Sequence, residues 1–229
     1  KKIFNILQKV KNYPWKSIND LENWDHGTNF VYLKELSNYW LTEFKWKKHE
    51  DIINSFSNFK TKVGEMDIHF IKEDGSGSNP KPLLLMHGWP GSIIEFTEII
   101  NQLAHPEKFG GEAEEGLTVI APSLPGFGFS DSPNKPIGPR KIAEMLNQMM
   151  VKNLKYENYV AQGGDWGATI ANWLGYDHST NCKAIHINCL TMRLPDGTQN
   201  DDEKKWLEKF DNDQIIQDGY RSQQGTKPQ

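Results

Sequence analysis

The spacing of apolar residues changes twice along the chain, near Pro80 and near Pro195. Before Pro80, apolar residues recur at helical spacing over 33–44, continue as a second short helix over 46–56, and alternate with polar residues over 61–71. This pattern predicts two helices followed by a β-hairpin or two successive edge strands. We therefore expect three segments: an N-terminal extension over 1–79, a central domain over 80–195 and a helical appendage over 196–229.

The central segment alternates short apolar runs with amphipathic stretches. Four runs have the composition of buried strands, at residues 83–86, 117–122, 159–162 and 183–189. The stretches between them have the length and periodicity of helices, at residues 92–103, 138–154 and 166–175. This alternation of strand and helix predicts an α/β fold, with a mostly parallel sheet and helices on both faces.

Composition narrows the classes of function. The 229 residues carry a formal net charge of -4 with the lysines dispersed among acidic residues, which argues against a nucleic-acid partner. No apolar run approaches the roughly 20 residues that span a bilayer, so we expect no membrane helix or signal peptide and a cytoplasmic protein. Cys182 and Cys189 are predicted to be two free, buried thiols in a reducing compartment. Histidines and cysteines do not repeat at metal-ligand spacings, and we expect neither a metal nor a cofactor.

The string Gly-Gly-Asp-Trp-Gly over residues 163–167, hereafter the elbow, lies where a predicted strand meets a predicted helix. That context is typical of a nucleophile elbow, in which small residues let the chain turn sharply and expose the central side chain. Asp165 occupies the central position, where the following helix N-terminus favours an ionised carboxylate. The alternative is that Asp165 only caps that helix.

The string His-Gly-Trp-Pro-Gly over residues 87–91, hereafter the oxyanion loop, follows the first parallel strand. Hydrolases of this architecture place at that point a loop that supplies a backbone amide to the oxyanion hole. Pro90 fixes the backbone so that amides can converge on one point. The alternative is an ordinary Pro-Gly turn with an incidental histidine.

Together with the strings over 121–130 and 219–228, these motifs resemble the α/β-hydrolase superfamily, and within it the epoxide hydrolases of the microsomal type. That group includes the insect juvenile-hormone epoxide hydrolases. The aromatic leader over 39–50 is similar to the family's N-terminal extension, whose meander wraps the hydrolase domain. The resemblance implies the N-terminal half of an α/β-hydrolase core within 80–195 and the start of a helical cap within 196–229, with the C-terminal strands absent.

The resemblance also implies that a small apolar epoxide is hydrolysed to a vicinal diol in two steps. Asp165 would attack an epoxide carbon to form a hydroxyalkyl ester, while the Tyr220 phenol would protonate the epoxide oxygen. The backbone amides of Trp89 and Trp166 would then stabilise the tetrahedral intermediate of ester hydrolysis. The implied substrate pocket is lined by His87, Gly88, Pro90 and Phe127, the last of them on a loop that we expect to be mobile.

In the family, a second tyrosine, a relay acid and a base histidine follow the cap, whereas none of the seven histidines here follows Tyr220. We therefore expect the chain to be incomplete for turnover, with a complementary C-terminal chain, a homodimer or a further C-terminal segment supplying the base. The strand over 183–189 should then have an uncovered outer edge, which favours association. Two alternatives stay open. One is a haloalkane dehalogenase, which also combines an Asp nucleophile with a His-Gly-x-Pro loop, and the other is a non-catalytic remnant or subunit.

Overall fold

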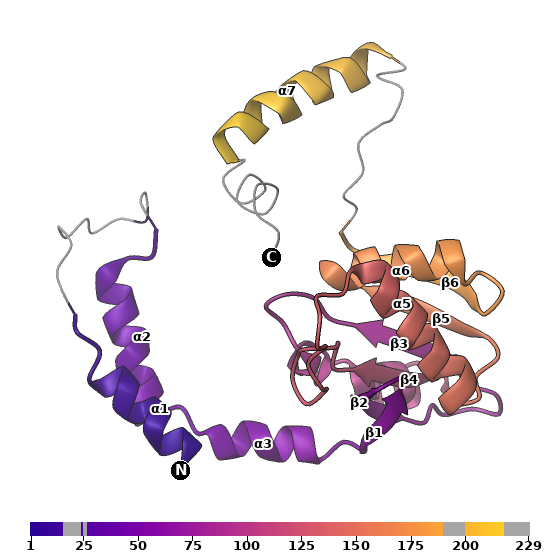
Figure 1. Ribbon diagram of the computed structural model, residues 1–229, viewed down its shortest axis with the longest axis horizontal. Helices are drawn as coiled ribbons and strands as arrows, with labels where there is room; N and C mark the ends of the chain where they lie inside the picture. The colour runs from indigo at the N-terminus through magenta and orange to yellow at the C-terminus, as the bar shows by residue number, and fades with distance from the viewer. Residues whose placement is uncertain (16–23, 25–26, 190–199, 218–229) are drawn as a thin grey trace. The chain divides into compact units, whose positions relative to one another are not determined.

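Figure 1 shows the computed structural model, which describes residues 1–15, 24, 27–189 and 200–217. The chain divides into two compact units, Lys1–Ser55 and Phe56–Gln229. In the part of the chain that the structure describes, no helix is long and apolar enough to cross a membrane.

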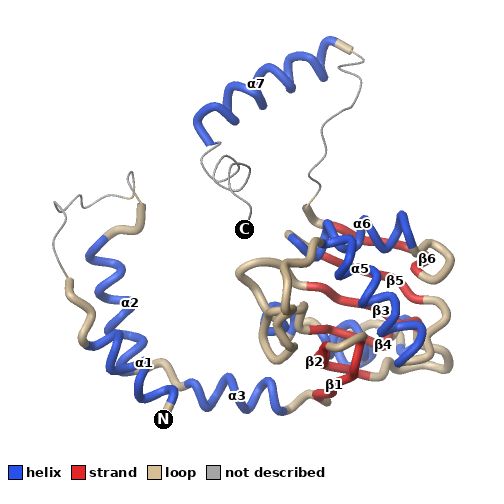
Figure 2. Tube along the Cα trace, viewed as in Figure 1, coloured by secondary structure: helices blue, strands red, loops and turns tan. Residues whose placement is uncertain are grey.

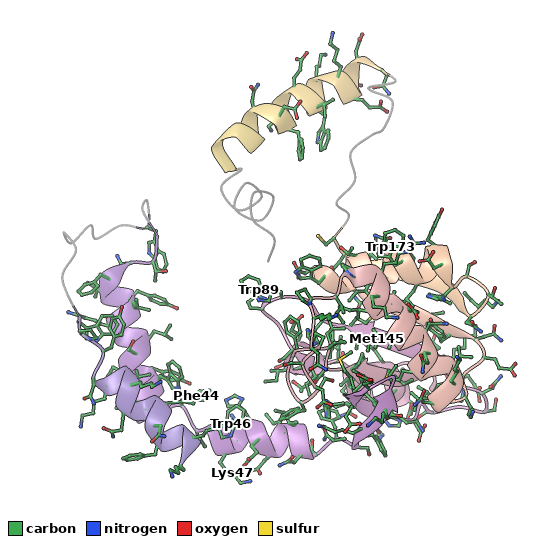
Figure 3. The ribbon with its side chains drawn as sticks, in the orientation of Figure 1. Phe44, Trp46, Lys47, Trp89, Met145 and Trp173 are labelled. Atoms are coloured by element: carbon green, nitrogen blue, oxygen red, sulfur yellow. The ribbon has the colours of Figure 1, made fainter. Side chains whose placement is uncertain are left out.

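The first unit is helical. Its helices are α1 (Lys2–Lys11), α2 (Phe30–Thr42) and α3 (Trp46–Asn54), so the two helices predicted between residues 33 and 56 are confirmed as α2 and α3. α2 begins after Asn29, whose side-chain oxygen accepts a hydrogen bond from the Tyr32 amide at 3.0 Å and caps the helix. Phe44 and Trp46, labelled in Figure 3, help to line an apolar groove of about 510 Å³ within this unit.

The second unit is built on one six-stranded sheet with the order β1-β2-β4-β3-β5-β6, drawn in red in Figure 2. The strands are β1 (Asn58–Val63), β2 (Met66–Glu73), β3 (Lys81–Met86), β4 (Leu117–Pro122), β5 (Tyr159–Gly163) and β6 (Cys182–Ile187). β4, β3, β5 and β6 are parallel neighbours, while β1 pairs antiparallel with β2 and β2 with β4. The predicted hairpin and the four predicted parallel strands are therefore confirmed.

The hairpin of β1 and β2 belongs to this sheet. β2 pairs antiparallel with β4 from Phe70↔Pro122 to Glu73↔Val119, and this ladder satisfies backbone groups that a separate hairpin would expose. The structure accordingly divides the expected 1–79 extension after Ser55, and the compact sheet unit begins at Phe56 rather than near Pro80.

The helices of the second unit are α4 (Ile100–Ala104), α5 (Pro139–Gln148), α6 (Trp166–Asp177) and α7 (Asp201–Gln217). α5 continues as a π-helical turn over Met149–Asn153. The helix predicted over 92–103 is interrupted. A 3₁₀ turn over Ile93–Phe96 comes first, stabilised by a capping box between Ser92 and Glu95, and only then does the short α4 begin.

Apolar side chains fill both faces of the central strands. Leu84 and Met86 of β3 belong to the main core cluster with Leu146 of α5 and Ile170 of α6. Leu85 points to the opposite face and is buried as well, at 2% exposure. Burying one such side chain fully contributes roughly 1.5–3 kcal/mol, so β3 anchors the sheet and holds the loop that follows it.

β6 is the edge strand of the described sheet. Its Ile185 is 39% exposed, which agrees with the expectation of an uncovered outer edge. Cys182 and Cys189 are both free thiols, but only Cys182 is buried. The prediction that Cys189 is buried is wrong, because the strand ends at Ile187 and Cys189 lies beyond it.

Candidate active site

The pairing of β3 with β5 brings the two predicted motifs together. These strands run parallel, and Met86 is the register partner of Gly163. The oxyanion loop leaves the sheet directly after Met86, and the elbow turns directly after Gly163. Both loops therefore emerge from the carboxyl edge of the sheet on neighbouring strands, the position at which open α/β sheets carry their sites.

Asp165 has the strained backbone of a nucleophile elbow. Its φ of 49° and ψ of -122° lie in a region that residues with a Cβ rarely adopt. Although Asp165 precedes the first residue of α6, its side chain makes no capping hydrogen bond. Instead, its Oδ1 accepts a hydrogen bond from the backbone N–H of Trp89 at 2.7 Å. The reading of Asp165 as a helix cap alone is therefore excluded.

Glycines allow the close approach on which this geometry depends. A Cβ built on Gly163 would lie 2.7 Å from the backbone nitrogen of Ala168, and one built on Gly167 would lie 2.8 Å from the carbonyl oxygen of His87. Both are nearer than ordinary van der Waals contact, and the atoms they would meet are backbone atoms that cannot rotate away. The elbow string thus packs α6 tightly against the ends of β5 and β3.

The oxyanion loop presents the Trp89 amide to the carboxylate. The Trp89–Pro90 peptide bond is cis, and the Trp89 side chain is exposed at the surface, as Figure 3 shows. Gly88 packs directly against Asp165, because a Cβ built on Gly88 would lie 2.5 Å from the Cβ of Asp165. Gly88 therefore lies beside the carboxylate, where the sequence predicted a pocket residue.

His87 lies beneath the loop. It is 1% exposed, its Nε2 accepts a hydrogen bond from the Leu124 N–H at 3.1 Å, and its Nδ1 is 2.9 Å from the Gly88 carbonyl oxygen. The first bond requires a lone pair on Nε2, which assigns the proton to Nδ1 and leaves the ring neutral. Burial lowers the pKa of His87, in agreement with that state. The Phe127 ring packs against this imidazole in a T-shaped arrangement, with the centroids 5.4 Å apart.

The loop after β4, which carries Phe127, is fastened to β2. The Ser123 N–H donates to the His69 carbonyl oxygen at 2.9 Å, and the Asp131 N–H donates to the Asp67 carbonyl oxygen at 3.0 Å. The Asp131 side chain also accepts a hydrogen bond from the Asp67 amide at 2.8 Å. These bonds extend the β2 pairing past the end of β4 and tie the loop to the sheet, while its mobility stays a prediction.

Of the two remaining predicted site residues, the structure describes only Trp166. Trp166 is the first residue of α6, so its N–H lies at a helix N-terminus and directly follows Asp165 in the chain. Tyr220 lies outside the described residues. Asn188, which no motif indicated, follows β6 and packs against the elbow, since a Cβ on Gly164 would lie 2.6 Å from its Oδ1.

Among the described residues, no histidine is hydrogen-bonded to Asp165. His87 has both ring nitrogens engaged, and His105 bonds to Glu73 and Ser76 elsewhere in the unit. The described residues also contain no group of three or more His, Cys, Asp or Glu side chains arranged to hold a metal ion. What the site offers is a carboxylate with one oxygen held by a backbone amide, an arrangement suited to attack on an electrophilic carbon.

Comparison with known proteins identifies the class to which this fold and site correspond. Residues 81–229 match the family described as the alpha/beta hydrolase fold, and the chain belongs to that family. The predicted fold is thereby confirmed. Residues 1–96 match a second family, described as the epoxide hydrolase N terminus, which agrees with the resemblance noted from the sequence.

The similar proteins are epoxide hydrolases. Epoxide hydrolase 1 of Oryctolagus cuniculus is 41% identical over 175 residues, which cover 73% of this chain and 38% of the rabbit protein. The juvenile hormone epoxide hydrolase of Manduca sexta is 34% identical over 191 residues, covering 81% of this chain and 40% of that protein. The structure of the Aspergillus niger epoxide hydrolase matches with a TM-score of 0.78 at 29% identity, covering 88% of this chain and 53% of that one. The chain thus spans about half the length, or less, of these relatives.

Proposed function

We propose that this chain supplies the nucleophile and the oxyanion hole of an epoxide hydrolase that converts apolar epoxides into vicinal diols. The observation that carries the proposal is the hydrogen bond of 2.7 Å from the Trp89 amide to Asp165 Oδ1. It fixes one carboxylate oxygen and leaves Oδ2 as the attacking atom. The similarity to epoxide hydrolases over both units supports the same chemistry.

In the first step, Asp165 Oδ2 forms a bond to an epoxide carbon as the carbon–oxygen bond of the strained ring breaks. The departing oxygen takes a proton from a phenol, a role we assign to Tyr220, and the product is a hydroxyalkyl ester. In the second step, a base takes a proton from water as it adds to the ester carbonyl carbon, and the negative charge develops on Oδ1. Collapse of this intermediate breaks the Cγ–Oδ2 bond, and the departing oxygen is protonated as the diol leaves. The Trp89 amide already donates to that atom, and the Trp166 amide is the second donor that we propose.

Ester hydrolysis needs a base that activates water. His87 cannot take this role, because its lone pair on Nε2 is used by the Leu124 amide. We propose that a histidine outside the described residues, with an acid partner, supplies this base. The two free cysteines support a reducing, cytoplasmic environment for the protein.

Mass spectrometry of the trapped ester tests this function. After incubation with an apolar epoxide, the peptide that contains Asp165 should gain the full mass of the substrate, and Asp165→Asn should abolish that gain. Asp74→Asn is the matched control, since Asp74 is an exposed carboxylate paired with Lys72 at 2.7 Å, and it should label like the wild type. Labelling at another carboxylate, undiminished in Asp165→Asn, would contradict the assignment. Halide release from a haloalkane, without epoxide labelling, would favour a dehalogenase.

A further inference from the structure

His69 of β2 lies at the centre of a buried polar cluster outside the reacting groups. The residue is 4% exposed. Its ring nitrogens are each 2.9 Å from a side-chain oxygen, Nδ1 from Ser123 Oγ and Nε2 from Asn58 Oδ1. Its backbone N–H donates to Ser130 Oγ, also at 2.9 Å. One histidine therefore joins β1, β2 and the loop that follows β4.

The contacts of the cluster assign the protons. The Asn58 amide nitrogen donates to the Phe56 carbonyl oxygen at 2.8 Å, so the Asn58 oxygen faces His69 and accepts the Nε2 proton. Nδ1 then carries a lone pair, which accepts the Ser123 hydroxyl proton. This arrangement requires a neutral ring. Burial, with a smaller effect of the Lys60 ammonium, lowers the pKa of His69 to about 4.

The cluster is connected to the oxyanion loop by consecutive hydrogen bonds. Ser123 is followed by Leu124, whose N–H donates to His87 Nε2 at 3.1 Å. His87 in turn holds the carbonyl oxygen of Gly88 at 2.9 Å. The next amide along the chain is the one that donates to Asp165. A shift of the Ser123 backbone would therefore reach the carboxylate through three hydrogen bonds.

We propose that His69 is a positioning residue for the nucleophile, acting through Ser123 and His87 to aim the Trp89 amide at Asp165. The effect of His69 on the reaction rate rests on the proposed function, whereas its effect on the position of the Trp89 amide does not. Gly128 packs closely over the Ser123 hydroxyl, since a Cβ built there would lie 2.6 Å from Oγ. Loss of the acceptor on His69 would leave that hydroxyl buried and unpaired, which favours displacement of the loop.

The test compares two buried hydroxyls at opposite ends of β4. Ser123→Ala removes the contact with His69, while Thr118→Val removes a hydroxyl that is equally buried but accepts from the Gly75 amide at 3.2 Å. In ¹⁵N-labelled protein, Ser123→Ala should shift the Trp89 amide resonance and Thr118→Val should not. Alkylation of Asp165 should slow on the order of 10-fold to 100-fold in Ser123→Ala only, as expected for a small misplacement of a reacting group.

Two substitutions of His69 separate positioning from folding. His69→Asn places an amide oxygen where Nδ1 was and keeps an acceptor for Ser123, whereas His69→Gln reaches only toward Asn58. His69→Asn should therefore alkylate faster than His69→Gln even when the two melt at the same temperature. An unchanged Trp89 resonance in Ser123→Ala, or equal alkylation by both His69 variants, would overturn the proposal. If the resonance shifts but the wild type never labels Asp165, the amide positioning stands and the proposed reaction fails.

Discussion

Gly88→Ala is the substitution that tests the site most directly. The added Cβ would lie 2.5 Å from Asp165 Cβ and 2.8 Å from its Cγ, while ordinary van der Waals contact begins near 3.4 Å. Rotation of the Asp165 carboxylate cannot relieve the first of these overlaps, because Cβ is fixed to the backbone. The aspartate must therefore move by about 1 Å relative to the oxyanion loop, which breaks its hydrogen bond to Trp89.

The expected loss of alkylation rate in Gly88→Ala can be calculated in two ways. Misplacement of a reacting group by about 1 Å costs on the order of 100-fold in rate, equivalent to about 2.7 kcal/mol of transition-state stabilisation. Loss of a hydrogen bond to a charged group costs about 1.5–3 kcal/mol. The two values agree, so we expect alkylation of Asp165 to slow about 100-fold in Gly88→Ala. Overpacking should also lower the free energy of unfolding by about 1–3 kcal/mol.

The assay is single-turnover alkylation followed by mass spectrometry, with thermal unfolding by circular dichroism to confirm that the variant is folded. Gly138→Ala is the control, because a Cβ there meets nothing within 4 Å and its φ of -89° suits any residue. It should alkylate at the wild-type rate. If folded Gly88→Ala also alkylates at that rate, the carboxylate does not react from the position described here, and the reasoning is refuted.

Further predictions concern Tyr220, the lifetime of the ester and the two buried histidines. In a form of the enzyme that turns over, Tyr220→Phe should slow ester formation about 10-fold to 1,000-fold more than ester hydrolysis, measured by rapid quench, because the phenol acts on ring opening. On residues 1–229 alone, the Asp165 ester should persist for hours, since no described histidine is hydrogen-bonded to Asp165; steady diol production over many cycles would contradict this. Finally, the fold lowers the pKa values of His69 and His87. As the pH falls, these histidines therefore bind protons in the unfolded chain at a higher pH than in the folded protein. The free energy of unfolding should drop by about 1.4 kcal/mol per pH unit for His69 between about pH 6.5 and 4, and urea titrations that are identical at pH 7 and pH 4.5 would contradict it.

Local patterns in the sequence are sufficient to predict the central strands and the elbow. Residues 83–86 are apolar without interruption, and a short run of this kind is stable only when both faces are buried, as they are in β3. The elbow combines small residues with a strand-to-helix junction, so its strain and its exposed carboxylate follow from neighbouring residues alone. These features leave a recognisable pattern within a few neighbouring residues, which a single sequence reports well.

Features that depend on distant residues could not be predicted in this way. Ser123 is 54 positions from His69, and neither residue belongs to a pattern that pairs them. The pairing of the hairpin with β4 could not be predicted for the same reason. The chain forms β3 first and only then forms β4, the strand that pairs with β2. The interruption of the predicted helix near Phe96 has a local cause. The apolar residues of 92–103 do recur at helical spacing, but the capping box at Ser92 stabilises a 3₁₀ turn that this spacing does not reveal.

The register of β3 against β5 links the stability of the core to the geometry of the reaction. Met86 faces Gly163, and each strand continues directly into one half of the site. A slip of one residue would displace the oxyanion loop along the elbow by about 3.3 Å, well beyond the range of a hydrogen bond, and would exchange the side chains that β3 packs on its two buried faces. The burial of Leu84 and Leu85 therefore opposes the same slip that would separate Trp89 from Asp165. Core substitutions in β3 should consequently impair alkylation only to the extent that they unfold the sheet, whereas substitutions in the loops can impair it in a folded protein.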